Sequence, residues 1–208
     1  MNSVVDDALK GEDVSRETVK RLQDFVTLVV KWNPAINLVA KSTIPEIWQR
    51  HVRDSMQLYP LVQANPKRWL DLGSGSGFPG VVLAILAHQR APEARFTLVE
   101  SDQRKAAFLR TACHSLGLNA QVLAARIENL PPQAADVITA RALAPLDKLC
   151  ALAAPHIAAG GICLFPKGGS YAEEVAEARR NWKMDLETFA SVTDPEAVIL
   201  KLKALVHV

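Results

Sequence analysis

Arg68-Trp-Leu-Asp-Leu-Gly-Ser-Gly-Ser-Gly-Phe-Pro-Gly80 is an apolar run that leads into a glycine-rich turn and then a proline. The apolar run predicts a buried strand, and Gly73, Gly75 and Gly77 let the backbone turn tightly and approach a ligand with no Cβ in the way. The proline suits the first turn of a following helix. A second apolar run, Phe96-Thr-Leu-Val-Glu100, ends in a carboxylate. In α/β folds, an acid about 20 residues after such a turn binds the ribose hydroxyls of an adenosine.

Two ligand classes fit this turn. Gly75-x-Gly77-x-x-Gly80 matches the dinucleotide fingerprint, whereas Asp71-x-Gly73-x-Gly75-x-Gly77 is similar to the first motif of class I S-adenosylmethionine methyltransferases. A dinucleotide presents a pyrophosphate, which a carboxylate at Asp71 would repel, whereas S-adenosylmethionine carries an ammonium and a sulfonium. Asp71 therefore favours the methyl donor. A turn that merely connects strand to helix is the non-functional interpretation.

Composition narrows the class of protein. The chain has 208 residues, of which 49% are apolar, and a net charge of +2, which fits one globular domain or one domain with a small extension. The polar, acidic first residues are not a signal peptide, and no apolar run is long enough to span a bilayer. Cys113, Cys150 and Cys163 are too widely spaced for a disulfide framework or a zinc motif, which points to the cytoplasm. The histidines show no metal-ligand spacing, so no metal is expected.

The pattern of the chain changes near residue 67. Residues 1–66 predict a helical extension that packs on a core formed by residues 67–208. Ser15 predicts the cap of a first helix, which Asn33-Pro34 ends, and Thr43-Ile-Pro-Glu46 predicts a capping box for a second helix, which Asn65-Pro66 closes. That second helix carries His51, Asp54 and Ser55, a polar trio that is either a buried hydrogen-bond network or a wall of the substrate cleft.

The core alternates predicted strands and helices, which is typical of a parallel sheet. We expect strands at 68–72, 95–100, 121–125, 135–140 and 161–166, and helices at 79–89, 103–116, 146–156 and 171–182. Residues 184–192 and 197–206 predict a hairpin. The expected fold is α/β, a Rossmann-like class I S-adenosylmethionine-dependent methyltransferase sheet, mostly parallel with an antiparallel C-terminal edge strand.

Motifs along nearly the whole chain resemble one family. They are Lys31-Trp-Asn33 with Ile36-Asn-Leu38, Arg50-His-Val-Arg-Asp-Ser55, the glycine turn through Phe78-Pro-Gly80, Leu98-Val-Glu-Ser101 with Arg104-Lys-x-x-Phe-Leu109, Arg126-Ile-Glu128, Arg141-Ala-Leu-Ala144 and Lys167-Gly168. In this order they are similar to the bacterial 16S ribosomal RNA guanine-N7 methyltransferase family RsmG, also called glucose-inhibited division protein B. Ala140 departs from the family, which often has serine there.

The resemblance implies methyl transfer from S-adenosylmethionine to N7 of a guanine in the 530 loop of 16S ribosomal RNA. The substrate would be presented within the 30S subunit, and we expect a monomer. With the glycine motif, the resemblance predicts donor contacts from Asp71, Gly73, Gly75, Gly77, Phe78, Glu100, Arg126, Ile127, Glu128 and Arg141. Candidate contacts to RNA phosphates are Lys41, Arg50, Arg53, Arg104, Lys105 and Lys167.

The chemistry of guanine N7 sets what the site requires. N7 has a lone pair and no proton, so it attacks the sulfonium methyl directly and needs no general base; alignment of the reactants and exclusion of water do most of the work. Arg141, directly after the fourth strand, is the candidate catalytic residue, because its planar fork could hold the base at the junction with the donor. A small-molecule methyltransferase, a nicotinamide-dependent oxidoreductase and a catalytically silent RNA-binding module are the alternatives.

Overall fold

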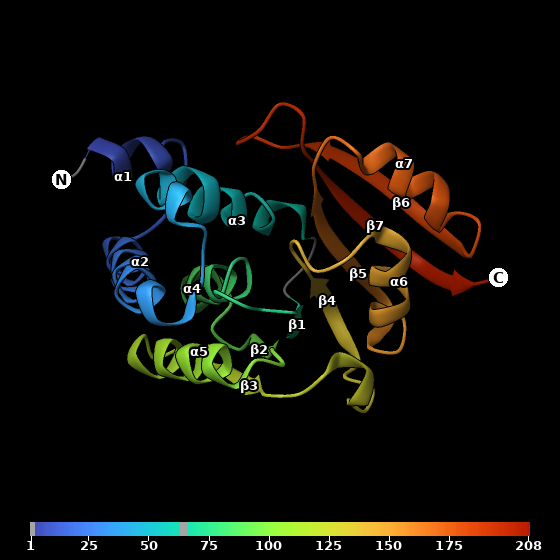
Figure 1. The fold of residues 1–208 in the computed structure, drawn as a ribbon, viewed down its shortest axis with the longest axis horizontal. Helices are drawn as coiled ribbons and strands as arrows, with labels where there is room; N and C mark the ends of the chain where they lie inside the picture. Colours follow the sequence, from blue (N-terminus) through green and yellow to red (C-terminus); the bar gives the residue numbers. More distant parts are fainter. Residues whose placement is uncertain (1–2, 63–65) are drawn as a thin grey trace.

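The computed structural model describes residues 3–62 and 66–208, which form a seven-stranded sheet with helices on both faces (Figure 1). The strands lie in the order β3-β2-β1-β4-β5-β7-β6. Their bounds are β1 Arg68–Leu72, β2 Arg95–Val99, β3 Ala120–Leu123, β4 Ala135–Thr139, β5 Ile157–Lys167, β6 Trp182–Ala190 and β7 Val198–His207. β1 to β5 run parallel, and β7 is antiparallel to both β5 and β6. The predicted parallel sheet with an antiparallel C-terminal end is confirmed, and β7 lies inside it.

The helices cover the two faces unequally. α4 (Gly80–Arg90) and α5 (Gln103–Ser115) lie on one face, and α6 (Leu146–Ala153) and α7 (Tyr171–Ala178) lie on the other (Figure 1). α2 (Arg16–Ile36) adds a further layer outside α4 and α5. Its apolar stripe, which includes Leu22, Phe25 and Val29, is buried in one cluster with side chains of α4 and α5. Burial of that stripe attaches the N-terminal helices to the face of the sheet that α4 and α5 cover.

α2 begins as predicted and ends later than predicted. The Ser15 side chain accepts a hydrogen bond from the Thr18 N–H and caps the helix. The helix then continues through Asn33-Pro34 to Ile36, and its C-cap residue Asn37 has a left-handed φ of 49°. Proline is tolerated there because the carbonyl it leaves without a partner belongs to Val30, which is exposed to water. The buried Asn33 side chain accepts a hydrogen bond from the Val39 N–H at 2.8 Å and fixes the chain after the helix.

The predicted second helix, from the capping box to Asn65-Pro66, is present as a helical run of mixed pitch and not as one regular α-helix; Asn65 lies outside the described residues. The run consists of 3-10 helices at Lys41–Glu46 and Tyr59–Leu61, a π-helical turn at Trp48–Arg53 and α3 at Asp54–Met56. Thr43 is not the cap of a longer helix, because its hydroxyl donates to the Ala40 carbonyl and contacts His51. The change from a tight 3-10 helix to a wide π-helical turn orients His51, Asp54 and Ser55 toward the sheet edge.

Other boundaries differ from the predictions by a few residues, and one element is new. A short helix, α1 (Ser3–Ala8), precedes α2, and α6 and α7 both end earlier than predicted. β5 begins before Gly160, whose φ of 75° bends the strand, rather than after it. Cys113, Cys150 and Cys163 are buried free thiols. In the part of the chain described, no helix combines the length and apolarity needed to cross a bilayer.

Candidate active site

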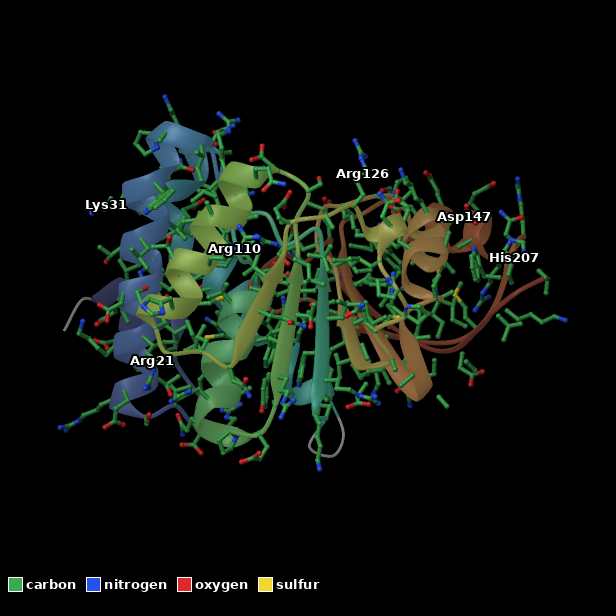
Figure 2. All side chains as sticks on the ribbon, turned by 90° about the horizontal axis from the view of Figure 1, so that it is seen from below. Arg21, Lys31, Arg110, Arg126, Asp147 and His207 are labelled. Atoms are coloured by element: carbon green, nitrogen blue, oxygen red, sulfur yellow. The ribbon has the colours of Figure 1, made fainter. Side chains whose placement is uncertain are left out.

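The loops after β1, β2, β3 and β4 meet at the carboxyl edge of the sheet and enclose a cavity of about 590 Å³, which we call the donor cavity. This edge, at the strand-order switch point, is where open α/β sheets bind ligands, and the volume suits a small organic molecule. Arg126 stands at this edge and projects outward (Figure 2). The lining residues are Leu38, Val39, His51, Gly73, Ser74, Gly75, Ser76, Phe78, Val99, Glu100, Ser101, Lys105, Ala125, Arg126, Ile127, Glu128, Arg141, Ala142, Leu143, Ala144, Lys148 and Leu152.

The glycine turn needs glycine for two different reasons. Gly73, with a φ of 65°, lies so close to the loop after β4 that an added Cβ would come within 2.7 Å of the Leu143 Cδ1. Gly77, with a φ of 86°, is not on the cavity wall; its Cβ would come within 2.7 Å of Val81 Cγ2 and 2.9 Å of Phe25 Cζ. Gly73 therefore shapes the cavity, whereas Gly77 packs the turn against α4 and α2, and its predicted donor contact stays a prediction.

Glu100, directly after β2, is the acid that the sequence placed on the ribose hydroxyls. Its Oε2 accepts a hydrogen bond from the Gly75 N–H at 2.8 Å, and its Oε1 accepts one from the Asp102 N–H at 2.7 Å. These two donors fix the carboxylate across the loop, and the residue is 9% exposed on the cavity wall. The side chain is therefore preorganised to accept further hydrogen bonds from a ligand in the cavity.

Asp71 lies beneath the glycine turn, away from the cavity wall where direct donor contact was predicted. It is 2% exposed, and its Oδ1 accepts a hydrogen bond from the Thr139 hydroxyl on the neighbouring strand at 2.6 Å. Its Oδ2 has no hydrogen-bond partner among the described residues. Burial raises the pKa of this carboxyl to about 6. An incompletely paired carboxylate under the loop fits a cationic ligand above it and would oppose a pyrophosphate.

The turn after β3 supplies a further wall of the donor cavity. Arg126, Ile127 and Glu128 all line it, and Ile127–Asn129 form a 3-10 turn. Ile127 is largely buried and presents an apolar surface, whereas Arg126 is exposed. An apolar side chain in the same cavity as the fixed Glu100 carboxylate is suited to the face of an adenine ring. These three predicted positions therefore stand on one wall with Glu100.

Arg141, directly after β4, is held by side chains from the N-terminal helices. Its Nη1 donates to Asp54 Oδ2 at 3.2 Å and to the Arg50 carbonyl at 3.3 Å, and its Nη2 donates to His51 Nδ1 at 3.0 Å. The guanidinium also lies over the Phe78 ring, 5.5 Å from the ring centroid. Arg141 is therefore a fixed part of the cavity wall, and among the described residues only its Nη1 and Nη2 groups have hydrogen-bond partners.

His51 is neutral in this arrangement. Arginine can only donate, so His51 Nδ1 must accept from Arg141, and Nε2 carries the proton that it donates to the Thr43 hydroxyl at 2.9 Å. Burial, together with the charges of Arg141 and Arg50, lowers the pKa of His51 to about 4. The ring also stacks on Phe78, with centroids 5.1 Å apart. Of the polar trio, Ser55 is buried and its hydroxyl donates to the His51 carbonyl, whereas His51 lines the cavity.

A second cavity of about 820 Å³, which we call the outer cavity, adjoins the first. The two share the wall formed by Arg141, Ala142, Leu143 and Ala144. Ala142 has a φ of 52°, a left-handed conformation that costs a residue with a side chain about 1 kcal/mol. The outer cavity is also lined by Glu46, Gln49, Arg50, Asp54, Pro145, Pro166, Lys167, Gly168, Glu174, Thr193, Asp194, Pro195 and Ala197.

The six candidate phosphate contacts have different surroundings in the structure. Lys105 lines the donor cavity, Arg50 lines the outer cavity, and Lys41 is exposed on the first 3-10 turn. Arg53 instead donates to the Asp7 carbonyl, and the exposed Arg104 pairs with Asp102.

Lys167 is a structural residue and not a free cation. Its ammonium donates to Glu174 Oε2 and to the Ala144 carbonyl, both at 2.7 Å, and the side chain is 9% exposed. The Lys167 ammonium therefore fixes the loop between the two cavities, and its charge is paired with Glu174.

Several wall residues were not predicted from the sequence. Leu38 and Val39 come from the segment after α2, and Lys148 and Leu152 come from α6. Local patterns do not reveal them, because they reach the cavity through long-range packing. In the described residues there is no cluster of histidine, cysteine, aspartate and glutamate side chains arranged to hold a metal ion.

Comparison with known proteins gives a consistent result. Residues 18–199 match the GidB family, described as rRNA small subunit methyltransferase G. A protein named Ribosomal RNA small subunit methyltransferase G from Cereibacter sphaeroides (strain ATCC 17029 / ATH 2.4.9) is 65% identical over 196 residues, which cover 94% of this chain and 95% of that protein. A protein of the same name from Rhodospirillum centenum is 50% identical over 192 residues, 92% of this chain and 87% of that one.

Solved structures share the fold at low sequence identity. A methyltransferase from Geobacter sulfurreducens has a TM-score of 0.59 at 15% identity and covers 98% of this chain and 96% of its own. A TehB-like SAM-dependent methyltransferase from Corynebacterium glutamicum has a TM-score of 0.57 at 13% identity, covering 88% and 98%. The predicted class I methyltransferase fold is confirmed.

Proposed function

This chain belongs to the GidB family, rRNA small subunit methyltransferase G, and we propose from that premise that it methylates N7 of a guanine in the 530 loop of 16S ribosomal RNA. The methyl donor is S-adenosylmethionine. The family and the fold support methyl transfer to small-subunit ribosomal RNA. The atom, the loop and the residues that contact the reactants are the finer parts of the proposal.

The donor cavity offers a matching group for each part of S-adenosylmethionine. In our proposal Glu100 accepts the ribose hydroxyls, and Ile127 packs on the adenine between Arg126 and Glu128. The glycine turn follows the chain of the methionyl part through Gly73 and Gly75, with Phe78 and Arg141 at its far end. Asp71 acts from below the turn as the counter-charge of the donor's cationic groups.

The observation that carries the proposal is the position of Arg141. It belongs to the walls of both cavities, so a donor in one and a base in the other would meet beside its guanidinium. The outer cavity has a polar rim, with Arg50 and Gln49 on it, which suits a nucleotide better than the closed apolar pocket expected for a small-molecule methyltransferase. The side chains held around Arg141 would orient O6 and N7 of a guanine.

Bound S-adenosylmethionine supplies an electrophilic methyl group, which the N7 lone pair takes directly while the electrons of the S–C bond stay on sulfur. The chain's polar groups agree with a reaction that needs no proton transfer. His51 Nδ1 is occupied by Arg141, and both oxygens of Asp54 accept hydrogen bonds. Arg141, Phe78 and His51 instead form a rigid wall that orients the reactants and excludes water.

Transfer of labelled methyl from S-adenosylmethionine to 30S subunits that lack the modification tests the proposal. We expect label on one guanine of the 530 loop, recovered as N7-methylguanine. Donor binding without label on 30S subunits would contradict the proposed substrate and move it to free RNA, an assembly intermediate or a small molecule. Protein-free 16S ribosomal RNA is the companion substrate, and equally fast labelling of it would contradict presentation by the 30S particle.

A further inference from the structure

Asp54 connects three elements that are far apart in the sequence. Its Oδ2 accepts from Arg141 Nη1 at 3.2 Å, after β4. Its Oδ1 accepts from Gln57 Nε2 at 2.9 Å and from the Thr193 hydroxyl at 2.9 Å, in the turn of the C-terminal hairpin. The side chains of Asp54 and Arg141 are each 17% exposed, so their ion pair is well shielded from water. A paired carboxylate in this position restrains its partner more than a surface ion pair would.

The hairpin turn, residues 191–197, is held to the same helical segment by Gln57. The Gln57 amide oxygen accepts from the Val192 N–H at 2.9 Å, and its nitrogen donates to the Ser191 hydroxyl at 3.2 Å. Thr193 itself lines the outer cavity, where the proposed function places the RNA. The hydrogen bonds therefore form a continuous path from the substrate side, through Thr193 and Asp54, to Arg141.

We propose that Asp54 is the positioning residue that sets the Arg141 guanidinium at the junction of the two cavities, and that the hairpin turn holds Asp54 through Thr193. This inference rests on the proposed function, because the junction matters only if donor and base meet there. Asp54 lines the outer cavity but not the donor cavity, so it acts on the donor side through Arg141. It is not a general base, since guanine N7 has no proton to lose.

A purely structural ion pair is the competing explanation, and the chain contains a matched control. Asp136 pairs with Arg68 at 2.9 Å and also accepts hydrogen bonds from two backbone N–H groups, at the amino end of the sheet and away from both cavities. Substituting aspartate by asparagine at either position removes one charge without changing the shape of the side chain. If the ion pair between Asp54 and Arg141 were purely structural, both variants would lose stability and keep the wild-type kcat.

The experiment compares Asp54→Asn, Thr193→Val, the double variant and Asp136→Asn. Binding of S-adenosylhomocysteine is measured by calorimetry, and methyl transfer to unmodified 30S subunits gives kcat and KM. For Asp54→Asn we expect kcat to fall by about 10- to 100-fold, because one charge-assisted hydrogen bond is lost. Donor Kd and substrate KM should stay within about 3-fold of the wild-type values. Thr193→Val should lower kcat by about 3- to 10-fold, and the double variant should be no slower than Asp54→Asn.

A measurement without RNA separates this inference from the proposed function. The guanidinium nitrogens of Arg141, assigned by NMR through Arg141→Lys, should show restricted rotation in the wild-type protein and fast rotation in Asp54→Asn. Restricted rotation that survives in Asp54→Asn would overturn the tether whether or not the enzyme labels guanine. An unchanged kcat in Asp54→Asn would overturn the positioning role. If the wild-type protein labels no guanine, the proposed function fails and the positioning role fails with it, while the NMR result still decides the tether.

Discussion

Glu100→Gln is the substitution that tests the donor site most directly. Glutamine keeps the size of the side chain and removes its charge, but its amide offers one oxygen and one NH₂ group. Both carboxylate oxygens of Glu100 accept backbone N–H groups, at 2.8 Å from Gly75 and 2.7 Å from Asp102. One of these donors would therefore face the NH₂ group in the variant, and the side chain would rotate away or lose a hydrogen bond.

The expected loss of donor affinity follows from these contacts. Two ribose hydroxyls that donate to one carboxylate form two charge-assisted hydrogen bonds, and each bond contributes about 1.5–3 kcal/mol. The amide keeps part of one of them, so binding should weaken by about 3–4 kcal/mol, which corresponds to roughly 100- to 1,000-fold in Kd. Calorimetric titration with S-adenosylhomocysteine measures this change.

Glu187→Gln is the matched control for Glu100→Gln. Glu187 lies on the exposed side of β6, where it pairs with Lys201 and Lys203, and it lines neither cavity. Its substitution should leave donor affinity unchanged within error. A folded Glu100→Gln protein that binds S-adenosylhomocysteine within about 3-fold of the wild-type Kd would refute the ribose role, because even one lost charge-assisted hydrogen bond exceeds that factor.

Three further predictions concern residues of the glycine turn and the junction. Burial raises the pKa of Asp71 from 3.8 to about 6, so the unfolded chain releases this proton at lower pH, and the free energy of unfolding should fall as pH rises from about 4 to about 6. Asp71→Asn should remove that fall, as measured by urea unfolding across this range, and an equal slope in the variant would contradict the assignment. Arg141→Ala should lower kcat more than donor affinity; an unchanged kcat with only a raised donor KM would be inconsistent with its place at the junction. Gly77→Ala should cost about 2–4 kcal/mol of unfolding free energy, from strain at φ 86° and contact with Val81, whereas Gly117→Ala, with φ 63° and open space around it, should cost about 1 kcal/mol. Similar losses for the two glycine variants would argue against the close packing at Gly77.

The sequence predicted the parts of the site that depend on local chain geometry. Gly73 and Glu100 line the cavity because a strand, a tight turn and the next strand place them at one edge whatever surrounds them. The sequence located Asp71 correctly in β1 but did not predict that its side chain is buried below the loop. A strand residue near the carboxyl end can point either above or below the loop that follows. The neighbouring Thr139 and the backbone of Gly80 determine that it is buried.

Features that depend on long-range packing escaped prediction. Residues 41–61 carry a helical pattern of apolar side chains, yet they form short turns of different pitch because they must follow the sheet edge and hold Arg141. Lys167 looks like a solvated cation in the sequence, and only its meeting with Glu174 makes it structural. Leu38 and Val39 line the donor cavity, and the buried Asn33 side chain that fixes this segment through the Val39 N–H is a contact that no periodicity reveals.

The packing of α2 on α4 and α5 has a consequence for how the chain is made. α2 ends at Ile36, but α5 is complete only at Ser115, and Leu22, Phe25 and Val29 are buried between them. At roughly 5–20 residues per second, translation leaves this apolar stripe without its final partner for about 4–16 seconds. α2 thus emerges early but is buried only after α5 has been made, and we expect the nascent chain to bind chaperones over that interval.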